Sequence, residues 1–205
     1  MYDINITQIS VTIPIQLGRI TEKMKTRLHE VLSKEVGFIN IGEGSVGIVF
    51  LPQNNQENLV INSDRITYTK LGNNFDNKRF VKIFTILLDI LMLDSNSKFV
   101  IDLRGLIKTD NSHTSSLERF KENYSSTLEN YKQVYGIGYR FLIDDADSKG
   151  EFKIEPLIQD KQFYFLQNII DSKNVLNIEN IGSKVNDNIN NFKGGYTDLI
   201  NKIIR

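Results

Sequence analysis

The order of strand-like and helix-like segments constrains this chain more than any other feature of its sequence. Ile9, Val11, Ile13 and Ile15 alternate with polar residues and Pro14, which is typical of a half-buried strand. Residues 17–34 have apolar side chains three or four positions apart, which indicates an amphipathic helix. Four short strand-like segments separated by turn residues follow, and then a strongly apolar helix. These five segments are residues 36–41, 46–51, 58–62, 65–71 and 76–93.

The same order of segments starts again after residue 95. A strand-like alternation at residues 99–104 precedes an amphipathic helix, four strand-like segments and a last helix. These six segments are residues 115–134, 137–143, 152–158, 162–166, 175–179 and 184–205. The predicted fold is therefore α+β, with two tandem β-α-β-β-β-β-α units. The units comprise residues 1–95 and 96–205, and we expect them to pack as one body around a largely antiparallel sheet.

This order of elements resembles the fold class of the TATA-binding protein, in which a duplicated β-α-β4-α unit forms a saddle. The resemblance is at the level of the fold. No motif of that family is present, so it assigns no role to any residue. The segment Ile137-Gly138-Tyr139-Arg140-Phe141-Leu142-Ile143 is similar to a strand in uncharacterised bacterial proteins of similar size. That second resemblance implies no activity.

Charge and composition exclude several classes of function. The 205 residues include 25 Lys and Arg and 25 Asp and Glu, so the chain lacks the net basic field of most nucleic-acid binders. Any basic surface must then be local. The absence of Cys excludes disulfides, thiol catalysis and sulfur-based zinc sites, and it suits a reducing cytoplasm. We expect no signal peptide, because residues 1–5 are not a basic segment followed by an apolar run. We expect no membrane span, because residues 80–93 are too short and contain Lys82 and Asp89.

Two strings in the sequence resemble ligand-binding motifs. Residues 42–49 fit the glycine-rich loop of protein kinases, but no lysine strand, H-R-D or D-F-G follows, so we expect a hairpin turn. Residues 144–150 resemble the start of a calcium loop, but Lys149 and Pro156 occupy positions that need oxygen ligands. A solvated hairpin turn is favoured there too. The chain has only two histidines, His29 and His113, so we expect no metal site and no cofactor.

Polar residues that alternate with apolar ones predict an uncovered face of the sheet. Asp102 and Arg104 interrupt an otherwise apolar strand, and Arg65, Arg140 and Lys153 alternate with buried-type neighbours in the same way. If helices cover one face, these residues collect on the other. The candidate binding residues are Arg65, Thr67, Asp102, Arg104, Arg140 and Lys153. The alternative is a structural role, such as a cross-strand ion pair between Asp102 and Arg140.

Three functions are compatible with these patterns. The first is a non-enzymatic binding protein that uses the uncovered face to bind a protein or a nucleic acid, since the planar fork of Arg binds either carboxylate or phosphate bidentately. The second is a carrier of a small apolar ligand, with a cavity between the sheet and the helix at residues 76–93. The third is a hydrolase that uses Asp102, Asp144 or Asp145 as acid and base. No motif fixes a pair of carboxylates, so the third is the least supported.

Overall fold

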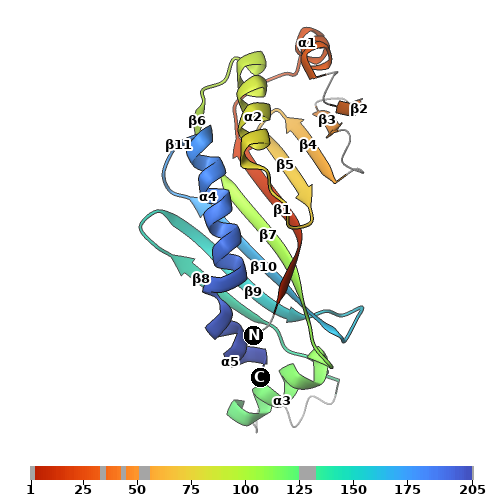
Figure 1. Ribbon diagram of the computed structural model, residues 1–205, viewed down its shortest axis with the longest axis vertical. Helices are drawn as coiled ribbons and strands as arrows, with labels where there is room; N and C mark the ends of the chain where they lie inside the picture. Colours follow the sequence, from red (N-terminus) through yellow and green to blue (C-terminus); the bar gives the residue numbers. More distant parts are fainter. Residues whose placement is uncertain (1–2, 33–35, 43–44, 51–55, 125–132, 205) are drawn as a thin grey trace.

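A large antiparallel sheet forms the centre of the molecule. The computed structural model describes residues 3–32, 36–42, 45–50, 56–124 and 133–204, with the backbone alone described for residues 36–42, 45, 47–50, 123 and 124. The strands of this sheet are β1 (Ile4–Pro14), β2 (Val36–Gly42), β3 (Ser45–Phe50), β4 (Glu57–Asn62), β5 (Arg65–Leu71), β7 (Val100–Lys108), β8 (Tyr139–Asp144), β9 (Ser148–Pro156) and β10 (Phe163–Ser172). They lie side by side in the order β2-β3-β4-β5-β1-β7-β10-β9-β8 (Figure 1). The prediction of an α+β fold around an antiparallel sheet is confirmed.

Helices cover one face of this sheet. The helices are α1 (Glu22–Leu32), α2 (Asn77–Leu91), α3 (Ser112–Tyr124), α4 (Ile178–Asn190), the π-helical turn η1 (Asn191–Gly195) and α5 (Thr197–Ile204). In Figure 1, α2 and α4 run along the front of the sheet, while α1 and α3 lie near its two ends. Gly182 lets α2 and α4 approach closely, since a Cβ there would lie 1.9 Å from Asn77 Oδ1. No helix in the described ranges is long and apolar enough to cross a membrane.

Strand β1 shows how the apolar pattern of the sequence is adapted to the sheet. Ile4 and Ile6 are buried at even positions, whereas Ile9, Val11 and Ile13 are buried at odd positions. The pairing of β1 with β7 shifts register between Ile6 and Gln8. A bulge adds one residue to a strand, so the alternation changes phase and all five side chains enter the same core.

The second half of the chain departs from the prediction in its last strand and last helix. The strand expected at residues 175–179 is only the two-residue β11 (Leu176–Asn177), which pairs with β6 (Asn96–Ser97) in a separate small sheet. Asn177 ends that strand early because its side chain accepts from Asn180 N at 2.8 Å and caps α4. The last helix is divided into α4, η1 and α5, with Gly194 and Gly195 at the break.

Three helix starts also differ from the prediction. Helix α4 begins at Ile178 rather than at residue 184, after its cap Asn177. Helix α1 begins at Glu22 rather than at residue 17, because Gly18 has a φ of 66° and Thr21 Oγ1 accepts from Met24 N at 3.3 Å. Helix α3 begins at Ser112, because Asn111 Oδ1 accepts from Thr114 N at 3.1 Å. Of the rest of the helix predicted at residues 115–134, residues 125–132 lie outside the described residues, and Gln133 and Val134 are not helical.

Aromatic rings fill the space between α2 and the sheet. Tyr68 on β5 meets Phe80 edge to face with 5.5 Å between ring centroids, and Phe80 meets Phe84 at 4.5 Å. Phe75 also packs against Tyr68 and Phe80. The carrier hypothesis places its apolar cavity at this helix, and this packing gives it no support.

A buried ion cluster fixes the start of α2 to the sheet. Glu57 on β4 is 2% exposed and accepts from Arg79 Nε at 2.9 Å. Lys70 on β5, in register with Glu57, is 4% exposed and places its Nζ 3.6 Å from the same carboxylate. The Glu57 carboxylate is therefore a counter-charge for both Arg79 and Lys70, in a place that water reaches poorly.

Replacing that carboxylate is expected to be costly. Glu57→Gln leaves the buried Lys70 ammonium without a counter-charge, so we expect the free energy of unfolding to fall by about 3–5 kcal/mol in urea denaturation. The control is Glu155→Gln, because Glu155 is exposed on β9 and its change is expected to stay within about 0.5 kcal/mol. Equal losses in the two variants would contradict the role assigned to the cluster.

Candidate functional site

The six predicted binding residues lie on the sheet face opposite α2 and α4, which we call the open face. Their strand neighbours Ile66, Ile101, Leu103 and Phe152 are fully buried under the helices. Side chains alternate across a strand, so the predicted residues point the other way. They keep partial exposure there. Arg65 and Thr67 come from β5, Asp102 and Arg104 from β7, Arg140 from β8 and Lys153 from β9.

Register across five strands aligns the cations of the open face in a row. Arg104 pairs with Gln8 of β1 on one side and with Gln167 of β10 on the other. Gln167 pairs in turn with Lys153, and Lys153 pairs with Arg140. Neighbouring strands lie about 4.8 Å apart, so residues 8, 104, 167, 153 and 140 form a line across the sheet. We call this line the cation row.

Acidic residues lie two positions along the strands from the cation row. Asp102 Oδ2 accepts from Arg104 Nε at 3.0 Å and from Arg104 Nη2 at 2.8 Å. Its other oxygen accepts from Gln167 Nε2 at 2.9 Å. The proposed ion pair between Asp102 and Arg140 is wrong, because β7 and β8 are three strand steps apart, about 14 Å. Asp102 instead orients the guanidinium of its own strand.

Glu151 is the counter-charge at the other end of the cation row. Its side chain is 12% exposed, and Oε2 accepts from Arg140 Nε at 2.6 Å while Oε1 lies 2.5 Å from Lys153 Nζ. These hydrogen bonds, first from Lys153 and then from Arg140, hold the pKa of Glu151 below its ordinary value of 4.5. Glu151 thus stays ionised and neutralises part of the positive charge.

Arg65 and Thr67 belong to a different part of the open face. Thr67 Oγ1 lies 3.1 Å from Thr12 Oγ1, and in the next register position Ser10 Oγ lies 3.2 Å from Thr69 Oγ1. Strands β1 and β5 therefore present paired hydroxyl groups. Arg65, at the start of β5, lies 3.8 Å from the exposed Asp64. The structure places Asp102, Arg104, Arg140 and Lys153 in or beside the cation row, in two ion-paired groups, and leaves Arg65 and Thr67 outside that row.

An apolar row on the other side of the cation row was not predicted. Leu106 of β7 pairs with Phe165 of β10, and both side chains are half-buried on the open face. Neither residue could be assigned to a face from the sequence, because residues 163–166 are all apolar and do not alternate with polar ones. Gln8, Gln167 and Glu151 were missed because polar residues in strands are common and only register puts them beside the arginines.

Of the three carboxylates in the hydrolase hypothesis, Asp102 is bound to Arg104 and Gln167, and Asp144 and Asp145 lie at a hairpin turn. The turn joins β8 to β9, as predicted, and Asp145 Oδ1 accepts from Ser148 N at 2.7 Å and from Asp147 N at 2.9 Å. These bonds lower the pKa of Asp145, and a hydrogen bond from Lys173 lowers the pKa of Asp144. A general acid at neutral pH needs a raised pKa, so neither group is suited to that role. In the other predicted hairpin, Gly42 pairs with Ser45, and Glu43 and Gly44 lie outside the described residues.

The remaining candidate positions have structural contacts. His113 lies within α3, where its Nε2 is 2.9 Å from Leu157 O and its ring packs against Tyr135.

A hollow of about 370 Å³ lies between α4 and the turn at residues 145–147, on the helix-covered side. Asp147, Lys184 and Asp187 are on its wall, so its chemistry differs from that of an apolar carrier.

Comparisons with known proteins provide no family for this chain. No family model matches it, and no curated protein matches it significantly. A functional assignment is therefore based on the cation row, the apolar row, and the acids Asp102 and Glu151 beside the cation row.

Glu151 predicts a pH dependence of stability. A carboxylate with a lowered folded-state pKa stabilises the folded protein above its unfolded pKa, and this stabilisation is lost as pH falls through the folded pKa. We expect wild type to melt at a higher temperature than Glu151→Gln at neutral pH, and the difference to shrink below about pH 4.5. The control is Glu155→Gln on the same face of β9. A difference between wild type and Glu151→Gln that does not change with pH would contradict the prediction.

Proposed function

We propose that this protein is a non-enzymatic binding protein of the cytoplasm that binds a protein partner through the open face. The observation that supports this most directly is the arrangement of the cation row beside the apolar row. Protein interfaces combine an apolar centre with arginines and a polar rim. Leu106 and Phe165 supply the apolar centre, and Arg104 supplies a guanidinium that is 41% exposed. Arg140, 62% exposed, belongs to the rim.

Charge pairing favours a protein over a nucleic acid as the partner. Duplex binding depends on cations that neutralise phosphates and release counterions. Here Asp102 compensates Arg104, and Glu151 lies between Arg140 and Lys153. Each of these three cations on the open face is thus paired with a carboxylate on its own strand or on the neighbouring strand. Such a surface suits a partner that also carries both signs.

We also propose that residues 1–95 and 96–205 are two copies of one unit, in the fold class of the TATA-binding protein. In each half, the first long strand pairs with the last strand that this half adds to the main sheet: β1 pairs with β5, and β7 pairs with β10. Outward from β5 and β10, the next strands are β4 and β9, and then β3 and β8. Strands β1 and β7 pair with each other at the centre of the sheet. Each half also ends in a helix on the covered face. The described part of the second half has no counterpart of β2 in the main sheet.

Crosslinking from the open face tests the proposed function. A photo-reactive amino acid in place of Leu106 should yield a discrete protein adduct in the native cell, because this position lies in the apolar row. The same group in place of Lys193, which is exposed on η1 on the covered side, should not. The adduct from position 106 should disappear when Arg104 and Arg140 are both changed to Glu. The matched control for that change is Lys184→Glu with Lys193→Glu, which alters net charge equally.

Two results would contradict the proposal. Equal adducts from positions 106 and 193 would mean that the open face has no preferred partner. A nuclease-sensitive adduct would mean that the partner is a nucleic acid. In that case, titration should show log K falling with log salt with a slope of about −3 to −4, since Arg65, Arg104, Arg140 and Lys153 would each contribute about −0.9.

A further inference from the structure

Strand β8 lies at one edge of the sheet, and no strand in the described part of the chain pairs with its outer side. Its only strand partner in the described part of the chain is β9, with which it pairs without a shift in register. The strand contains no proline, and Leu142 at its centre is 79% exposed. At the opposite end of the sheet, β2 carries a register shift between Val36 and Phe38. Bulges protect edge strands from pairing with another chain, and β8 lacks this protection.

The outward backbone groups of β8 belong to Arg140, Leu142 and Asp144. Asp145 N donates to Ser148 O at 3.0 Å, so these two residues form a hydrogen-bonded pair of the hairpin. Such pairs alternate with non-hydrogen-bonded pairs along an antiparallel ladder. Phe141 and Ile143 therefore direct their N–H and C=O groups to β9. The N–H and C=O groups of residues 140, 142 and 144 point away from β9, to the outer side of the sheet.

The side chains of the same three residues are complementary to themselves. On the open face, Arg140, Leu142 and Asp144 are exposed and follow one another as cation, apolar residue and anion. In an antiparallel pair of two such strands centred on residue 142, Leu142 faces its own copy. Arg140 of each strand then faces Asp144 of the other. Both charge pairs and the apolar contact fall on one face, where cross-strand pairs stabilise a sheet.

We propose that β8 pairs antiparallel with β8 of a second copy of this chain, in the register that places Leu142 opposite Leu142. About six backbone hydrogen bonds would form, two for each of the three facing pairs. The two sheets would continue into one, and the two open faces would lie on the same side. Arg140 has five donors, so it can bind Asp144 of the second copy and retain Glu151. The inference does not depend on the proposed function of the open face.

The observed packing of β8 leaves these groups available. The inner side chains Tyr139, Phe141 and Ile143 pack against the core of their own copy, which holds the strand in place. Asp144 keeps 68% exposure although its Oδ1 is near Lys173 Nζ. The strand is thus rigid on its inner side and accessible on its outer side, as required of a template for strand addition.

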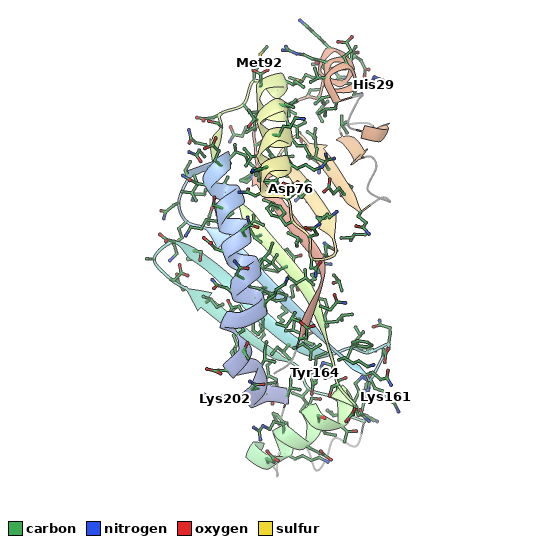
Figure 2. The ribbon with its side chains drawn as sticks, in the orientation of Figure 1. His29, Asp76, Met92, Lys161, Tyr164 and Lys202 are labelled. Carbon is green, nitrogen blue, oxygen red and sulfur yellow. The ribbon has the colours of Figure 1, made fainter. Side chains whose placement is uncertain are left out.

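Disulfide crosslinking tests both the association and its register. The chain has no Cys, so Leu142→Cys provides one thiol per copy. Two residues in a hydrogen-bonded antiparallel pair have Cα atoms about 5.5 Å apart, which a disulfide can span. Mild oxidation should crosslink Leu142→Cys at least tenfold faster than Met92→Cys. Met92 is 84% exposed at the end of α2, near α1 and away from β8 (Figure 2). Equal rates would overturn the proposal.

Charge variants test the pairing without a covalent bond. Wild type should sediment at twice the 23.6 kDa of one chain at high protein concentration. Arg140→Glu alone and Asp144→Lys alone each place like charges opposite each other, so each should remain monomeric. Mixing the two variants restores two opposite-charge pairs, and the mixture should form a dimer of one copy of each.

Thermal melting of each variant gives the control for folding, since both positions are exposed. The proposal fails if wild type sediments as a single chain at all concentrations. It also fails if the mixture does not associate, or if the single variants associate as well as wild type does.

Discussion

The pairing of β1 with β7 is the interaction on which the rest of the structure depends. These two strands join the first and second halves of the chain at the centre of the sheet, and their side chains on one face are the middle of the core. A shift of one residue in this pairing would turn every apolar side chain of one strand to the wrong face. The bulge between Ile6 and Gln8 is what allows a long strand with two apolar phases to keep a single buried face.

The register of the strands that follow β7 decides the chemistry of the open face. Because Gln167 is opposite both Arg104 and Lys153, and Lys153 is opposite Arg140, the cations fall into one row and the acids Asp102 and Glu151 into the next. Arg104 and Lys153 each have a carboxylate two residues away on the same strand, and Arg140 has one on the neighbouring strand β9. This arrangement explains how a chain with no net charge can expose several arginines and remain locally balanced. Such balance suits selective recognition better than general attraction to phosphate.

The two ends of the sheet differ in a way that follows from local sequence. Strand β8 is continuous because Arg140, Leu142 and Asp144 alternate regularly with apolar residues that hold it to the core. Strand β8 has no bulge in its pairing with β9, and an edge strand without a bulge presents its backbone groups regularly to another chain. The charges at its two ends set the direction and register in which a second strand would fit.

The sequence by itself determined the order of elements and most of their faces, because apolar periodicity depends on neighbouring residues alone. It placed Arg104 and Arg140 opposite the core side, and it predicted the hairpin at Asp144 to Gly150. It could not show that Asp102 binds Arg104 and Gln167, or that Glu151 lies between Arg140 and Lys153. The contacts of Asp102 with Gln167 and of Glu151 with Arg140 join different strands, up to 65 positions apart, so they depend on strand order and register. The short β11 and the divided last helix were likewise decided by caps and packing, which act on the folded chain and leave little trace in periodicity.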